Sequence, residues 1–291
     1  MPFGQRILTG NTNVRMCYVL AKFALMKLHN YFTLLFFFLA IGCSDFQKTL
    51  KNDDVAKKNE LASALYEDGN YRKAAQLYAQ LKELYRGKPQ AERIVFFYAN
   101  SLLETKNYIL AGYEFETFIK AYPKSQKVDE AYFLMAYAQY KLSPNYSLDQ
   151  KDTFLALDKI QEFINRYPNS ERMAQANDMA QELRLKTEKK GFEVAKQYNT
   201  IRDYKASIKS LDNFIADNPG TSYREAALFV QLSAATTLAV NSVDYKKENR
   251  LQDAKSKFDN FKRLYPESSH MEEAVELLED IEQEIRTFAS N

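Results

Sequence analysis

The sequence predicts an all-α fold: an α-solenoid of about five helical hairpins with a C-terminal capping helix. Four phenylalanines are each followed five residues later by a proline, and such repetition is typical of a solenoid. Between these motifs, apolar residues recur every three or four positions, which indicates amphipathic helices. Glycine and proline number only 8 and 7 in 291 residues, too few for a chain with many tight turns. The phenylalanines are Phe118, Phe163, Phe214 and Phe261.

Each copy of the motif carries similar residue types at the same distances. Seven residues before the phenylalanine lies a small residue, which lets two helices cross closely, and the proline after it stops the helix. In the first copy, Leu81 replaces the phenylalanine and Arg86 the proline. The alanines are Ala74, Ala111, Ala156 and Ala254, and the prolines are Pro123, Pro168, Pro219 and Pro266. The pattern resembles the second helix of a tetratricopeptide repeat, which implies that these residues set the architecture.

The copies are longer than the ~34 residues usual for that repeat. Extra length lies in a loop over 142–151 and in a second loop over 241–249. It also lies in the first, or leading, helix of the fourth hairpin, which we expect to be long and to cover about 170–199. Because the shared positions set the architecture, we expect function to depend on these differences between copies and on the acidic last helix. The expected repeats cover about 55–88, 91–125, 127–169, 170–220 and 222–267, and the capping helix covers 268–288.

Two features of the repeats leave alternatives open. The last helix is strongly acidic between Glu272 and Glu284. It either covers the end of the solenoid with a polar surface or forms an acidic docking face. The aromatic-rich segments 95–98 and 131–137 either pack between neighbouring helices or line a groove that recognises extended peptide.

The N-terminal segment has the features of an export signal. Residues 31–41 form an apolar run of eleven, which is short of the ~20 residues of a membrane-spanning helix but typical of a signal-peptide core. The pair Gly42-Cys43 directly after this run resembles the lipobox of bacterial lipoproteins, which implies a lipid on Cys43. The alternative is a plain secretory signal or an uncleaved anchor with Cys43 unmodified.

These observations define the expected domains. We expect a signal peptide over 1–42, a lipidated cysteine with a short polar tether over 43–54, and the repeat domain over 55–291. A basic segment that begins at Met26 suits the start of a signal peptide, so we expect translation to start there.

The residue inventory disfavours catalysis. The two histidines, His29 and His270, lie far apart, and the two cysteines, Cys17 and Cys43, both lie at the N-terminal end. There is no paired-histidine zinc motif, no glycine-rich phosphate loop and no nucleophile with an evident base. We therefore expect no enzyme activity, no metal and no cofactor. Beyond residue 42 the chain has 36 basic and 38 acidic residues, so its charge gives no case for nucleic-acid binding.

The chain resembles the BamD family of lipoproteins in three features taken together. These are the lipobox, the five over-long repeats, and a recurring Tyr-Pro-x-Ser at 122–125, 167–170 and 265–268. The resemblance implies a non-catalytic scaffold of the β-barrel assembly machinery. Such a scaffold would be anchored to the outer membrane on its periplasmic side. Its implied partners are a BamA-like barrel protein, other subunits of the machinery and unfolded outer membrane proteins.

Two other classes of envelope protein are alternatives. Glycan-binding lipoproteins of the SusD type also combine this repeat with a lipid, but they are much longer and bind sugars on tryptophan platforms, whereas this chain has no tryptophan. Coordinators of the Tol-Pal type usually contain a coiled coil, and no sustained heptad pattern is present here.

Overall fold

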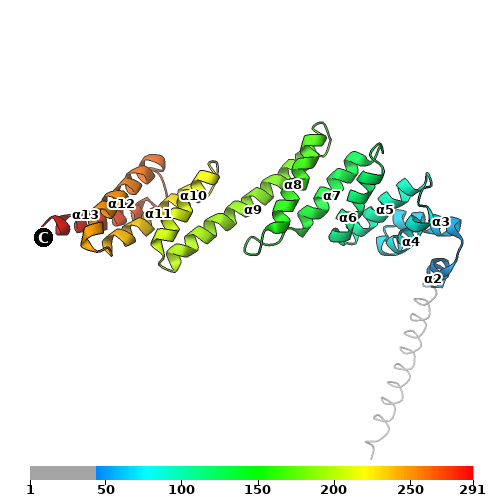
Figure 1. Cartoon of the computed structure of the whole chain (residues 1–291), viewed down its shortest axis with the longest axis horizontal. Coiled ribbons are helices and arrows are strands. Elements are labelled where there is room, and N and C mark those ends of the chain that lie inside the picture. Colours follow the sequence, from blue (N-terminus) through cyan, green and yellow to red (C-terminus); the bar gives the residue numbers. More distant parts are fainter. Residues whose placement is uncertain (1–43, 291) are drawn as a thin grey trace, which may run out of the picture. The chain divides into compact units, whose positions relative to one another are not determined.

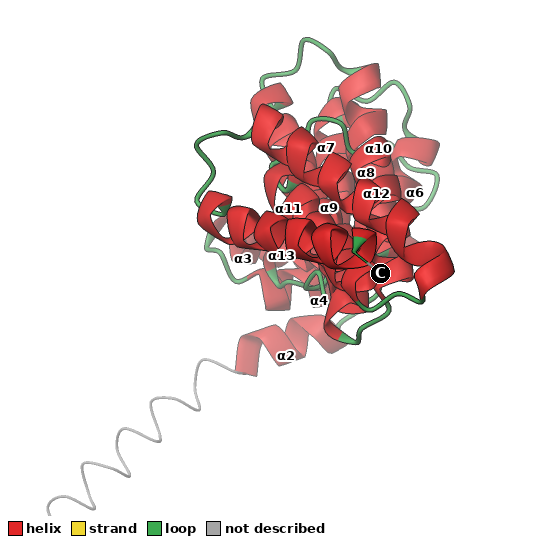
Figure 2. Ribbon diagram, turned by 90° about the vertical axis from the view of Figure 1, so that its left-hand side faces the viewer, coloured by secondary structure: helices red, strands yellow, loops and turns green. Residues whose placement is uncertain are grey.

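The computed structural model describes residues 44–290, and every element in that range is a helix (Figures 1 and 2). Cys43, the apolar run and the candidate start at Met26 lie outside the described residues. The chain divides into two compact units, 1–107 and 108–291. The boundary falls within the expected second repeat. The prediction of an all-α fold built from tetratricopeptide-like hairpins is confirmed.

The first unit contains a short helix followed by a hairpin and a third long helix. Ala62 on the first hairpin helix and Ala74 on the second are completely buried, so the two backbones can approach closely. The turn between them contains Gly69 at φ 74°, a left-handed conformation that glycine adopts without strain. Asp54 begins the hairpin by accepting a hydrogen bond of 3.0 Å from the Lys57 amide. The helices are α2 (Ser44–Lys51), α3 (Val55–Glu67), α4 (Tyr71–Leu84) and α5 (Ala91–Glu104).

Helix α2 occupies most of the segment that the sequence predicts to be a tether. Phe46 is only 7% exposed, and the Lys73 ammonium of α4 lies 5.5 Å from the centre of its ring. An eight-residue helix is not stable alone in water, so its packing on α3 and α4 explains its presence. The expected tether is therefore largely a docked helix.

The second unit consists of eight helices in which each packs against the next along the chain. The last helix, α13 (Met271–Ala289), buries Ala274 and Ile281 against α11 (Arg224–Val240) and α12 (Asp244–Leu264), and so it caps this end as predicted. The helices are α6 (Tyr108–Ala121), α7 (Val128–Leu142), α8 (Lys151–Arg166), α9 (Met173–Thr200), α10 (Tyr204–Asp217), α11 (Arg224–Val240), α12 (Asp244–Leu264) and α13 (Met271–Ala289).

The prediction of a loop over 241–249 is wrong for most of that range, because α12 begins at Asp244 and runs for 21 residues. Side chains at the start of this helix hold it in place. The Lys247 ammonium lies 2.7 Å from the Glu284 carboxylate of α13, and the Arg250 guanidinium donates 2.6 Å to the Ser242 hydroxyl. The partner of Lys247 is 37 residues away, so it leaves no pattern in the local sequence.

The recurring Tyr-Pro-x-Ser motif ends one helix and orders the turn that leads into the next helix. Helices α6, α8, α10 and α12 each end two residues before the proline, because a proline disfavours helical backbone in the residue before it. The Ser or Thr hydroxyl two residues after the proline then accepts a hydrogen bond from the backbone N–H two positions on. The four bonds are Ser125 with Lys127 (3.0 Å), Ser170 with Arg172 (3.3 Å), Thr221 with Tyr223 (3.2 Å) and Ser268 with His270 (3.0 Å).

Candidate interaction site

The repeated positions predicted from the sequence lie in the interior or in turns, not on a binding surface. Ala74, Ala111, Ala156 and Ala254 are completely buried. Phe118, Phe163, Phe214 and Phe261 are buried, whereas Pro123, Pro168, Pro219 and Pro266 are exposed at the turns. The alanines allow close packing, the phenylalanines fill the space beside them, and the prolines separate the helices. Function must therefore lie elsewhere.

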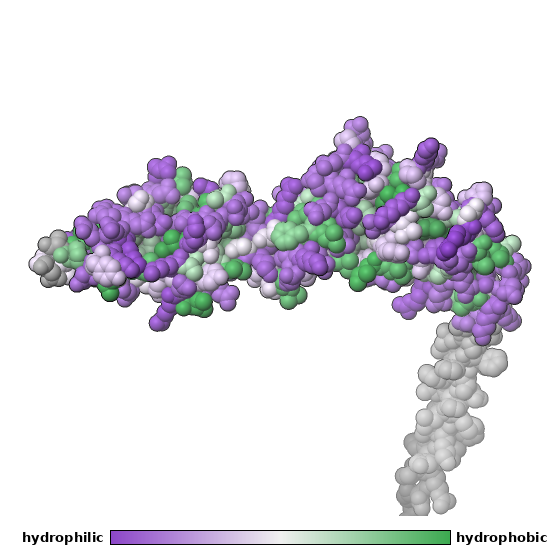
Figure 3. Space-filling model, in the orientation of Figure 1, coloured by the Kyte–Doolittle hydropathy of each residue, from purple (hydrophilic) through white to green (hydrophobic). Residues whose placement is uncertain are grey.

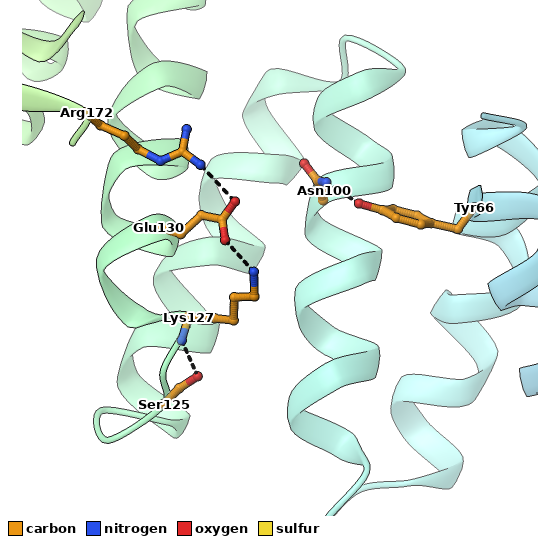
Figure 4. A network of polar contacts seen from close by, with 6 residues as sticks. All are labelled: Tyr66, Asn100, Ser125, Lys127, Glu130 and Arg172. Atoms are coloured by element: carbon orange, nitrogen blue, oxygen red, sulfur yellow. Dashed lines mark hydrogen bonds and ion pairs between the residues drawn. The ribbon is translucent and has the colours of Figure 1, made fainter. Parts of the chain in front are cut away.

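The aromatic-rich segments mostly pack between helices. In the second unit, Phe133 is buried and its ring centre lies 5.4 Å from that of Phe163. In the first unit, the Asn100 amide donates a hydrogen bond to the Tyr66 hydroxyl (Figure 4), and burial raises the pKa of the Tyr66 phenol above its usual value. Tyr66 also packs on Phe97, with ring centres 4.6 Å apart. These contacts favour the packing interpretation over the groove interpretation.

Two parts of the chain depart from the regular repeat: the long helix α9 and the loop before α8. These two parts lie in contact. Helix α9 has 28 residues, twice the length of α10, and its middle contacts the loop 143–150. The Lys186 ammonium donates 2.8 Å to the Ser143 hydroxyl, and the Lys190 ammonium donates to the Leu148 carbonyl. The Lys189 ammonium lies 4.3 Å from the centre of the Tyr146 ring. Three lysines of α9 thus hold the loop against the helix.

The loop is further ordered by one buried amide. Gln150 is 4% exposed, and its side-chain NH2 donates to the carbonyls of Asn145 at 2.9 Å and Leu148 at 3.0 Å. Its side-chain oxygen accepts from the Thr153 hydroxyl at 2.8 Å. The Thr153 hydroxyl also lies 2.7 Å from the Ser143 hydroxyl. Because these buried polar groups satisfy one another, the loop is pre-organised.

Between this loop, the start of α8 and the middle of α9 lies an open depression, which we call the loop–α9 groove. Two adjoining cavities form it, with volumes of about 360 and 660 Å³, and both are lined by Lys190 and Val194. Phe154 is 56% exposed and Val194 is 46% exposed in the larger cavity. Exposed apolar side chains of this size in a depression are typical of interaction surfaces. On the face drawn in Figure 3, hydrophobic residues likewise reach the surface in patches among hydrophilic ones.

A polar network fixes the N-terminal end of α9. The Glu130 carboxylate of α7 lies 3.0 Å from the Arg172 guanidinium and 2.8 Å from the Lys127 ammonium, and Ser125 binds the Lys127 backbone (Figure 4). The Arg172 guanidinium also lies 5.0 Å from the centre of the Phe133 ring. Half-exposed ion pairs stabilise little, about 0–1 kcal/mol each. Their contribution is therefore geometric: they set where α9 starts relative to α7.

The acidic helix α13 is partly paired within its own unit. Lys247 and Lys255 of α12 lie 2.7 and 3.5 Å from the carboxylates of Glu284 and Glu282. The remaining carboxylates, such as those of Glu272 and Glu276, lie on the exposed side. Together with the buried Ala274 and Ile281, this arrangement is that of a polar terminal cap.

Residues 44–290 hold no group of three histidine, cysteine, aspartate or glutamate side chains placed to bind a metal ion. None of the helices in this same part of the chain combines the length and the apolar character needed to cross a membrane.

Comparison with known proteins assigns the family. A family model described as "YfiO: Outer membrane lipoprotein" matches residues 54–251 and, in a second match, residues 187–287. No curated protein matches. Among solved structures, the "TPR2AB-domain:pHSP90-complex of yeast Sti1" is 14% identical, with 78% of this chain and 98% of that chain covered, at a TM-score of 0.35. A likeness of that size carries no argument, whereas the family matches span most of the chain. This chain belongs to the YfiO family of outer membrane lipoproteins.

Proposed function

We propose that this protein is a non-catalytic scaffold of the β-barrel assembly machinery. It would bind a BamA-like barrel protein, other subunits of the machinery and unfolded outer membrane proteins. Membership of an outer membrane lipoprotein family and a fold of tetratricopeptide-like hairpins support the proposal. In this proposal the lipid is on Cys43 and the described residues face the periplasm.

The observation that carries the proposal is the loop–α9 groove. Its walls are pre-organised by the Gln150 amide and the α9 lysines, so a partner need not order the loop on binding. Its apolar side chains, Phe154 and Val194, offer exposed surface whose burial against a partner would contribute to affinity. A scaffold needs such a fixed surface, and it needs no reacting group.

The test is purification of the tagged protein from membranes in mild detergent, followed by mass spectrometry of the proteins that come with it. We expect a large outer membrane barrel protein with the natural chain and its loss with Phe154→Ser combined with Val194→Ser. Tyr245→Ser is the matched control, because Tyr245 is 78% exposed on α12 and lies outside the groove. Absence of any barrel protein with the natural chain would contradict the proposal. Equal loss with Tyr245→Ser would contradict the role of the groove.

The lipid on Cys43 has its own test. A Cys43→Ala chain should leave the membrane fraction once its signal is processed, and a mass spectrum of the natural protein should show the lipid. A natural mature protein that begins at Cys43 without the added mass of a lipid would contradict the anchor.

A further inference from the structure

Another cavity lies in the first unit, beside the segment that follows Cys43. It is formed between α2 and α3 and has a volume of about 540 Å³. This volume falls within the ~300–1,000 Å³ typical of small-molecule sites. Its polar lining comes from Lys48, Thr49, Asn52 and Lys57, and its apolar side from Leu61 and Ala64.

The lining is rich in hydrogen-bond donors. Each lysine ammonium carries three N–H donors, and the Thr49 hydroxyl and Asn52 amide can donate as well. The Asn52 side-chain oxygen accepts 3.1 Å from the Asp54 amide, so the NH2 group is the part of this side chain that can donate to a ligand. Glu60 contributes a carboxylate to the same lining. A ligand with a negatively charged, acceptor-rich group fits this lining.

The cavity is held open by the docking of α2. Phe46 and Thr49 are buried against the first hairpin, and the Lys73 ammonium lies over the Phe46 ring. Because the helix is already fixed, a ligand would not have to order it, which favours binding.

The place of the cavity indicates the source of the ligand. Lys48 lies four residues after Ser44, which is about 6 Å along a helix. A lipid on Cys43, the residue before Ser44, would therefore bring the cavity to the headgroup layer of the membrane. Leu61 and Ala64, which lie on the same face of α3 as Lys57, suit the glycerol and first acyl carbons of a lipid.

We propose that this cavity binds the phosphate group of an anionic membrane-lipid headgroup. The source of the ligand rests on the proposed lipid anchor at Cys43, while the phosphate chemistry rests on the lining alone. Binding of a second lipid beside the anchor would hold the first hairpin at a set angle to the membrane surface.

The test measures binding by the full-length protein in detergent. The probes are glycerophosphoglycerol, which is a lipid headgroup without acyl chains, glycerophosphocholine and inorganic phosphate. Hydrogen–deuterium exchange of residues 44–64 reports occupancy. We expect glycerophosphoglycerol to slow exchange there and Lys57→Gln to weaken its binding about fivefold, the effect of one lysine next to a phosphate. Lys51→Gln is the matched control, since Lys51 lies on α2 outside the lining.

Three outcomes would overturn the proposal. No protection by glycerophosphoglycerol, or equal weakening by Lys57→Gln and Lys51→Gln, would exclude the cavity as a headgroup site. Binding of inorganic phosphate without glycerophosphoglycerol would exclude a lipid as the source. Unchanged exchange of α4 in the variants shows that the hairpin remains folded. The barrel protein of the purification experiment is a separate readout, so failure of one proposal is distinguishable from failure of the other.

Discussion

Helix α8 carries two phenylalanines in opposite environments, and replacing each by alanine should separate stability from binding. Phe163 is completely buried, with ring centres of Phe133 and Tyr167 at 5.4 and 5.9 Å. Burial of a phenylalanine stabilises by about 1.5–3 kcal/mol, and the cavity left behind raises the cost of Phe163→Ala to about 3–5 kcal/mol. Phe154 is 56% exposed, so Phe154→Ala should cost only about 1 kcal/mol.

The assay is hydrogen exchange of α7 and α8 under native conditions, supported by urea unfolding. A repeat protein can lose one repeat before the others, so local exchange is the sharper measure. We expect the free energy of opening in α7 and α8 to fall by about 3–5 kcal/mol for Phe163→Ala. Phe154→Ala should leave exchange nearly unchanged and weaken capture of the barrel partner. Similar exchange in the two variants, or a loss below about 1 kcal/mol for Phe163→Ala, would refute the assignment of core and groove.

Three further predictions concern other elements. Ser170→Ala removes the acceptor of the Arg172 amide and should destabilise the first turn of α9 by about 1 kcal/mol, measured by hydrogen exchange with the exposed Asn169→Ala as control. The Glu182 carboxylate accepts 2.5 Å from the Tyr140 hydroxyl and raises the pKa of that phenol from 10.0 to about 12. The folded state thus holds the proton more tightly, so this contribution to stability is complete below pH 10 and is lost as the pH rises towards about 12. Tyr140→Phe should flatten that fall in alkaline unfolding curves; an unchanged slope would contradict it. Gly191→Ala would place a Cβ 3.1 Å from the Phe214 ring. Crowding should cancel the gain of about 1 kcal/mol in helix propensity, and a rise in stability of that size in thermal unfolding would disprove the close contact.

The sequence was sufficient for the helical class of the fold because its signals are local. The spacing of apolar residues and the positions of prolines can be recognised over a single helical turn or hairpin. Together they predict helices and the points at which the helices end. Helix α2 carries only a very short signal of this kind, because Phe46 and Leu50, spaced by four, are its only large apolar residues, and the helix depends on contacts with α3 and α4. Helix α12 similarly extends into an expected loop, where the ion pair of Lys247 with the distant Glu284 helps to hold it.

The candidate site could be predicted only in part. The loop after Leu142 and the long helix α9 were both evident as departures from the repeat, and they were the expected places for function. Their association depends on contacts over about 40 residues of sequence, such as Lys186 with Ser143, which no periodicity encodes. Gln150 looks like an ordinary polar loop residue, yet its buried amide orders the whole loop. The signals that the sequence did offer for this site were the unusual length of the loop after Leu142 and the lysine-rich face of α9.

The turns that join one helix pair to the next also explain how hairpins of unequal length coexist in one chain. Each such turn has a proline at the same place and the same hydrogen bond from a backbone N–H to a Ser or Thr hydroxyl. The helices that follow these turns, α7, α9, α11 and α13, therefore start from a similar local geometry. An insertion within one hairpin is then absorbed before the next begins. Evolution can accordingly lengthen a single loop or helix, as at 143–150, and acquire a new surface without disturbing the packing of its neighbours.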